Sequence, residues 1–310
     1  MPFNCRLPVV WFNQDPSVDG KTGFVTFPAA TLSAPTGSPP KPAQFTYSTS
    51  YDRTVERWLP VSPEAVAPDG LHYAYTDYDQ PAPNDLKAGV TTGRVHIVDA
   101  RSGDDRIVYT GSPFAVVDYT AAGLHLARLT TAQYAAQRRG LYLMDPADGI
   151  PHLVPGSDVQ LDFGGWRALD GDAAWGTRYS GVGGMASGNE LFRIDIKTGE
   201  IVSWLTAPTT HSIYILGFDN GNPLVSSSLS GFTTGQSLET TVMLMTGPGQ
   251  ARSIYSSDFE GPGLLGVADT HGIWTGGGGS IWLYQPASGI RPIHVLADPN
   301  TALEVGGACV

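Results

Sequence analysis

Apolar residues along this chain fall in short stretches, and pairs of stretches are joined by glycine-containing turns. Five segments share this shape: VHIVDARSGDDRIVYTG from Val95, LYLMDPADGIPHLVPG from Leu141, LFRIDIKTGEIVSWLTAP from Leu191, VMLMTGPGQARSIYSS from Val242 and IWLYQPASGIRPIHVLA from Ile281. Four of the turns have glycine at the same offset, and the other has Gln250 there, directly after Gly249. A glycine turn between apolar runs is a strong hairpin signal, because the turns that suit hairpins need positive φ. Each segment is therefore predicted to be a β-hairpin.

A second hairpin is predicted before each of these segments. Its turns end at Gly70, Gly123, Gly171, Gly221 and Gly272, in steps of 53, 48, 50 and 51 residues. Four antiparallel strands repeated about every 50 residues are typical of a β-propeller. The alternative is a β-sandwich, or a pair of them, but a sandwich gives no reason for the constant spacing. No long stretch has the 3.6-residue apolar period of a helix.

The five repeats occupy about residues 62–297 and leave an unequal remainder at each end. Residues 1–61 contain three strand-like segments, RLPVVWF, GFVTFPAATL and FTYSTSYDRTVERWLPV, and residues 298–310 contain one, TALEVGGACV. One strand plus three makes a further blade. We therefore predict an all-β fold and a single domain over residues 1–310. It is a six-bladed β-propeller with four antiparallel strands per blade, closed by the N- and C-terminal strands in one composite blade.

Two segments resemble the repeat of the TolB-type (WD40-like) six-bladed propeller family. They are SPEAVAPDGLHYAYTD with GRVHIVDARSG, and LYLMDPADG. The family's S-P-D-G turn reads Ala67-Pro68-Asp69-Gly70 here. The resemblance covers roughly residues 60–297 and implies the architecture. It implies no single activity, since this repeat occurs in scaffolds, peptidases and lyases alike.

Cys5 and Cys309 are the only two cysteines, one at each end of the 310 residues. In a composite blade they would lie at adjacent strand ends, within the Cα separation that a disulfide needs. The bridge would close nearly the whole chain and contribute about 4–5 kcal/mol in the chain-entropy model. Two free buried thiols, a metal pair and a lipid-modified Cys5 are the alternatives. A persistent disulfide favours an oxidising compartment, so we expect a secreted, periplasmic or cell-surface protein whose leader has been removed.

Charge excludes one large class of partners. The net charge is −11 and the pI about 4.9, and no basic patch is present that could neutralise phosphates. Nucleic acid is therefore not expected as a partner. No apolar run reaches the ~18 residues of a membrane span, so no transmembrane segment is expected either. We expect a monomer that binds a glycan, peptide or protein.

Standard catalytic motifs are absent, and catalytic residues stay unknown at this stage. GPGLLG from Gly261 matches the dinucleotide-binding pattern only in its letters, because no helix follows it. His72 and His125 occupy equivalent places in two repeats, which favours a packing role. His211 differs, because it begins a predicted innermost strand, where propeller sites commonly open.

The connections between second and third strands are long, and long loops on a rigid scaffold tend to carry function. We therefore place the site on the face that these loops form. The candidate ligand-binding residues that enter this face are Asp77, Asp79, Arg128, Trp166, Arg178, Tyr179 and His211. For each one, a solvated loop residue or a salt bridge between blades is the alternative.

The chemistry of these candidates sets the functional hypotheses. Arginine binds carboxylates or sulfates bidentately, and Trp166 and Tyr179 would stack on a sugar. No cofactor motif is evident, but Asp77 and Asp79 could bind Ca²⁺ or act as acid and base. The first hypothesis is an exported binding module that acts through its long-loop face. The alternative is a propeller hydrolase or lyase acting on a polysaccharide, ester or lactone, with Ca²⁺ in the channel.

Overall fold

The chain folds almost entirely into β-strands. The computed structural model describes residues 3–13, 20–38, 40, 49–79, 92–129, 138–158, 160–161, 165–178, 188–229, 239–258, 261–263, 266–277, 279–296 and 301–310. Within these ranges, the helical residues are confined to η1 (Pro63–Ala65), a single 3-10 turn. None of the helical structure in them is long and apolar enough to span a membrane. The predicted all-β class is confirmed.

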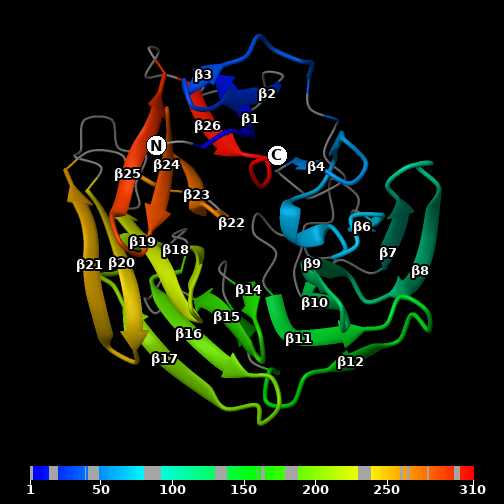
Figure 1. Cartoon of the computed structure of the whole chain (residues 1–310). Helices are drawn as coiled ribbons and strands as arrows, with labels where there is room; N and C mark the ends of the chain where they lie inside the picture. The colour runs from blue at the N-terminus through cyan, green and yellow to red at the C-terminus, as the bar shows by residue number, and fades with distance from the viewer. Residues whose placement is uncertain are drawn as a thin grey trace, which may run out of the picture.

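The strands form separate antiparallel sheets arranged around a central axis, as in a β-propeller (Figure 1). Three sheets each contain four strands from one sequence repeat, in simple sequence order. They are β14 (Gly165–Asp170), β15 (Ala173–Arg178), β16 (Glu190–Asp195) and β17 (Ile201–Thr206); β18 (His211–Asp219), β19 (Asn222–Leu229), β20 (Thr240–Gly247) and β21 (Gln250–Ser257); and β22 (Val267–Asp269), β23 (Gly272–Gly277), β24 (Ser280–Gln285) and β25 (Gly289–Val295).

Another repeat forms a sheet with one extra strand. Its order is β12-β11-β10-β9, and β13 also pairs with β11. The bounds are β9 (Phe114–Thr120), β10 (Gly123–Leu129), β11 (Arg138–Met144), β12 (Pro151–Leu153) and β13 (Gln160–Leu161).

The first repeat lacks a regular innermost strand. Its sheet has three strands, β6 (His72–Tyr78), β7 (Gly93–Asp99) and β8 (Asp105–Gly111). The innermost position is taken by η1 and Val66, which forms a single bridge with Tyr73. Pro63 and Pro68 flank this segment, and proline cannot donate a ladder hydrogen bond. The prolines therefore explain why a longer strand does not form here.

The two ends of the chain meet in one sheet, with the order β26-β1-β2-β3. Its strands are β1 (Arg6–Asn13), β2 (Lys21–Thr26), β3 (Thr31–Leu32) and β26 (Thr301–Val305). β26 pairs antiparallel with β1, with Val305 opposite Val9. Cys5 and Cys309 form the expected disulfide, with their Cα atoms 5.7 Å apart.

The composition of this sheet differs from the prediction in one respect. The segment GFVTFPAATL supplies both β2 and β3, joined by a turn at residues 27–30 in which Ala30 has a φ of 52°. The described part of FTYSTSYDRTVERWLPV instead forms a separate hairpin of β4 (Ser50–Asp52) and β5 (Arg57–Leu59). The prediction that this third segment joins the composite sheet was wrong, because a turn splits the second segment into two strands.

The core consists of apolar layers between neighbouring sheets. The composite sheet packs on β23 and β24 through a cluster that includes Leu7, Val9, Trp274, Leu283 and Leu303. Each such side chain contributes about 1.5–3 kcal/mol when it leaves water. Side chains therefore hold the sheets to one another, helped by single backbone hydrogen bonds between sheets, such as that from Gly249 N to Trp204 O.

Candidate functional site

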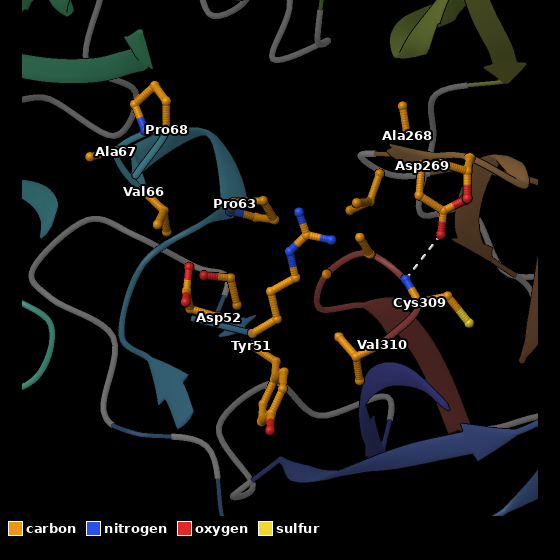
Figure 2. Close-up of a pocket in the computed structure, with 16 residues that line it drawn as sticks. Tyr51, Asp52, Pro63, Val66, Ala67, Pro68, Ala268, Asp269, Cys309 and Val310 are labelled. Carbon is orange, nitrogen blue, oxygen red and sulfur yellow. Dashed lines mark hydrogen bonds between the residues drawn. The ribbon is translucent and has the colours of Figure 1, made fainter. Parts of the chain in front are cut away.

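A pocket of about 560 Å³ opens where the innermost strands end. One wall comes from the end of β4 and from the segment that follows η1, and it includes Asp52 and Val66. The other comes from the end of β22, its turn, and the chain after β26, and it includes Asp269 and Cys309 (Figure 2). The pocket is thus built by four separate segments of the chain that only the tertiary fold brings together.

Asp269 fastens two of these parts to each other. Its Oδ1 accepts hydrogen bonds from the backbone N of His271, at 2.7 Å, and lies 3.2 Å from Nδ1 of the same residue. Its Oδ2 accepts from Nε1 of Trp274, at 2.9 Å, and from the backbone N of Cys309, at 3.0 Å. Figure 2 shows the bond to Cys309. The carboxylate is therefore used in holding the pocket wall.

The opposite wall contains two adjacent charged residues, Asp52 and Arg53, whose side chains do not form an ion pair with each other. Asp52 Oδ1 accepts from the backbone N of Thr54, at 2.6 Å, and of Val55, at 3.1 Å, and so fixes the tight turn between β4 and β5. Arg53 is exposed and lines the pocket.

Three carboxyl groups lie on the innermost segments of neighbouring sheets, toward the ends of those segments where the pocket opens. Glu64 belongs to η1, between the pocket-lining Pro63 and Val66; Asp118 lies on β9; and Glu304 is the penultimate residue of β26. Burial raises the pKa of Asp118 to about 7, and the nearby charge of Glu64 adds to the rise. Burial also raises the pKa of Glu304 to about 7.

Glu64 and Asp118 are neighbours, since η1 packs beside β9. The surrounding protein limits the hydration of Glu64 and raises its pKa, although part of its surface remains open to water. Two close carboxyl groups in such a place share a proton readily, because like charges oppose the second ionisation. The pair is therefore able to hold a proton near neutral pH.

His125 lies next to this pair, directly opposite Asp118 in the β9–β10 ladder. It is 5% exposed, its Nδ1 has no hydrogen-bond partner among the described residues, and burial lowers its pKa to about 4. The equivalence with His72 predicted a packing role for this imidazole. The structure adds that it stays neutral beside a carboxyl that titrates near pH 7.

The sequence-predicted acids Asp77 and Asp79 come together around Arg94. Arg94 Nε donates to Asp77 Oδ1 at 2.7 Å, and its Nη2 donates to Asp79 Oδ1 at 3.0 Å. This pairing corresponds to the salt-bridge alternative, but it links two strands of one sheet and not two blades. Ca²⁺ binding by these acids stays a prediction.

The side chains of Arg178 and Trp166 are also engaged in contacts inside their own sheet. Arg178 makes a bidentate pair with Glu190, with Nε–Oε2 of 2.8 Å and Nη2–Oε1 of 2.9 Å. Trp166 is fully buried, edge-to-face with Phe192. The expectation that Trp166 stacks on a sugar is corrected, because its ring has no exposed face.

The remaining candidates are not brought to the pocket. His211 begins β18, and its Nδ1 lies 3.1 Å from Thr210 Oγ1; Arg128 is half-buried on β10. Tyr179 lies outside the described residues, as do most of the long second-to-third connections. A site on the long-loop face therefore stays a prediction.

One close group of potential metal ligands exists within the described ranges, formed by Cys5, His271 and Cys309. The two sulfur atoms are bonded to each other, so neither is available as the thiolate that a metal needs. This group is therefore a disulfide beside a histidine.

Sequence reasoning missed the pocket and the channel carboxyls, but a signal for the carboxyls was present. Asp118 interrupts FAVVDYT and Glu304 interrupts TALEV, and both are apolar innermost strands. An acid in such a stretch is rarely buried without a role or a partner. The pocket left no comparable signal, because its two walls come from residues about 200 or more positions apart.

Comparison with known proteins gives the fold and no family. No protein-family model matches the chain, and no curated protein matches it in sequence. A structure provisionally named a 6-phosphogluconolactonase, from Bacteroides fragilis, is similar over 100% of this chain and 99% of that one, with a TM-score of 0.54 and 10% identity. Prolyl oligopeptidase B from Galerina marginata is similar over 77% of this chain and 35% of its own, with a TM-score of 0.50 and 11% identity. An oligogalacturonate lyase in complex with manganese has a TM-score of 0.47 and 10% identity.

Proposed function

We propose that this protein is a propeller hydrolase that opens a small lactone or ester at the mouth of its central channel. The observation that carries the proposal is the Asp118–Glu64 carboxyl pair, with a pKa of about 7 at Asp118, at the channel end where the pocket opens. An acid–base group works best when its pKa is near the working pH. The name of the similar Bacteroides fragilis structure supports the lactone class.

We assign one carboxyl group the role of base and the other the role of acid. Glu64, partly open to water, takes a proton from the attacking water molecule as its oxygen adds to the carbonyl carbon. Asp118, whose pKa is raised to about 7, gives its proton to the alkoxide oxygen as the C–O bond of the ester breaks. The products are a carboxylic acid and an alcohol, and the proton taken up by Glu64 returns to Asp118 or to solvent. The neutral His125 beside Asp118 adds no competing charge.

The test is turnover of a panel of lactones and esters by the wild type, Asp118→Asn and Glu64→Gln. Each substitution is expected to lower kcat by about 10²–10⁴-fold, the usual contribution of a general acid or base. Asp104→Asn, which removes an exposed acid in the β7–β8 turn, is the matched control and should keep full activity. Full activity in Asp118→Asn, or no turnover of any panel member by the wild type, would refute the proposal and favour a binding module.

We also propose that the sheets form a closed six-bladed ring of the TolB type and that the protein is exported. The composite sheet and the Cys5–Cys309 bond support both ideas, because structural disulfides persist in oxidising compartments.

A further inference from the structure

The charged side chains that line the pocket are one arginine and two aspartates, and the arginine pairs with neither aspartate. Asp269 uses both of its oxygens to hold the pocket wall, and Asp52 uses Oδ1 to fix the β4–β5 turn. Arg53 makes no hydrogen bond or ion pair with any residue in the described part of the chain, although both acids line the same pocket. Five N–H donors therefore face the pocket region without a protein acceptor.

A second group at the pocket also lacks a partner. Ser50 lines the pocket and is 3% exposed, yet its Oγ has no hydrogen bond within the described ranges. A buried hydroxyl without a partner is uncommon, because it loses its hydrogen bonds to water and gains none in return. Ser50 and Arg53 belong to the same short segment around β4, but Ser50 Oγ has no accessible surface, so Arg53 is the group of this segment that a ligand would meet.

From the unpaired guanidinium in this pocket we infer that the pocket binds the anionic group of a small molecule, a carboxylate or a phosphate, through Arg53. Arginine matches both groups with two parallel N–H bonds. The volume of about 560 Å³ fits a ligand of monosaccharide size. Apolar neighbours such as Pro63, Val66 and Val267 would contact the rest of that molecule.

The charge of the molecule makes this site selective. The chain has a net charge of −11, and Asp118, Glu64 and Glu304 lie along the channel at this end. An anion is therefore disfavoured deeper in the channel and is held at the mouth by Arg53. This inference rests on the proposed function only in assigning the anion to the substrate, whose lactone or ester carbonyl would then point toward the carboxyl pair.

The test is direct binding, measured by isothermal titration at low salt, because salt screens exposed charges. The probes are inorganic phosphate, D-glucuronate and, as the neutral control, D-glucose. We expect the wild type to bind phosphate, glucuronate or both in the millimolar range or tighter, and glucose not at all. If the protein binds phosphate and not glucuronate, the site prefers a phosphate group. If it binds glucuronate and not phosphate, the site prefers a carboxylate.

The variants then identify the donors. Arg53→Gln should weaken anion binding at least tenfold. Arg53→Lys should weaken it less, since the charge remains and the planar pair of N–H donors is lost. Arg101→Gln removes the same charge from an exposed turn outside the pocket lining and should bind as the wild type does. Circular dichroism checks that every variant is folded.

Two results would overturn the inference: no binding of either anion by the wild type, or wild-type affinity in Arg53→Gln. The outcome is separate from that of the proposed function. Asp118→Asn should keep the anion affinity even where turnover is lost, so a failure of catalysis with intact binding counts against the hydrolase and not against the anion site.

Discussion

At the scale of single residues, Asp118 makes the stability of the fold depend on pH. A carboxyl whose folded pKa is about 7, against about 3.9 unfolded, keeps its proton in the folded state between roughly pH 4 and 7. The folded state then binds more protons than the unfolded state, so stability is highest below this window and falls as pH rises through it. At 1.36 kcal/mol per unit, the loss for Asp118 is at most about 4 kcal/mol.

Asp118→Asn removes this loss. We expect the free energy of unfolding of the variant, relative to the wild type, to rise between about pH 4 and 7 by about 2–4 kcal/mol and to stay level above pH 8. Urea unfolding at pH 4.5 and pH 8 measures it. Glu304 and His125 titrate in both proteins, so they largely cancel in the difference. Asp104→Asn is the control and should show no such change; a flat difference for Asp118→Asn would mean that Asp118 is charged in the folded protein.

At the scale of elements, the contact between β23 and β26 depends on a missing side chain. A Cβ at Gly276 would lie 1.8 Å from the carbonyl oxygen of Leu303, so any larger residue forces the two backbones apart. We expect Gly276→Ala to cost about 3 kcal/mol or more, because it disrupts the packed layer between the composite sheet and its neighbour. Gly247→Ala, where the added Cβ meets only an ordinary contact at 3.4 Å, is the matched control. The measurement is the melting temperature of each variant. Equal melting temperatures for Gly276→Ala and Gly247→Ala would contradict the prediction.

At the scale of the whole molecule, the Cys5–Cys309 bond joins residues 304 positions apart. Constraint of so long a loop in the unfolded chain stabilises the folded state by about 2–5 kcal/mol. Cys5→Ser with Cys309→Ser should therefore lower the melting temperature while the β-sheet circular dichroism signal remains. The wild type treated with reductant is the parallel measurement. If neither the double variant nor the reduced wild type melts at a lower temperature than the oxidised wild type, the disulfide does not stabilise the fold.

The sequence by itself determined the strand repeats and the pairing of the ends. The turn glycines Gly103, Gly149, Gly199 and Gly289 have φ values of 81°, 67°, 75° and 73°, as the hairpin interpretation requires. This worked because turn geometry and strand alternation are local properties that a few adjacent residues impose. The two cysteines needed only the deduction that both ends share one sheet.

Only the tertiary structure decided where the candidate site lies. Residues 50–53, 63–68, 267–270 and 307–310 have no common motif, and they meet because blades pack around an axis. The same packing buried Trp166 and paired Asp77, Asp79 and Arg178 within their sheets. A side chain's exposure and its partner depend on neighbours far away in the chain, and local patterns contain no information about them. That is the physical reason why the sequence predicted the scaffold and not the pocket.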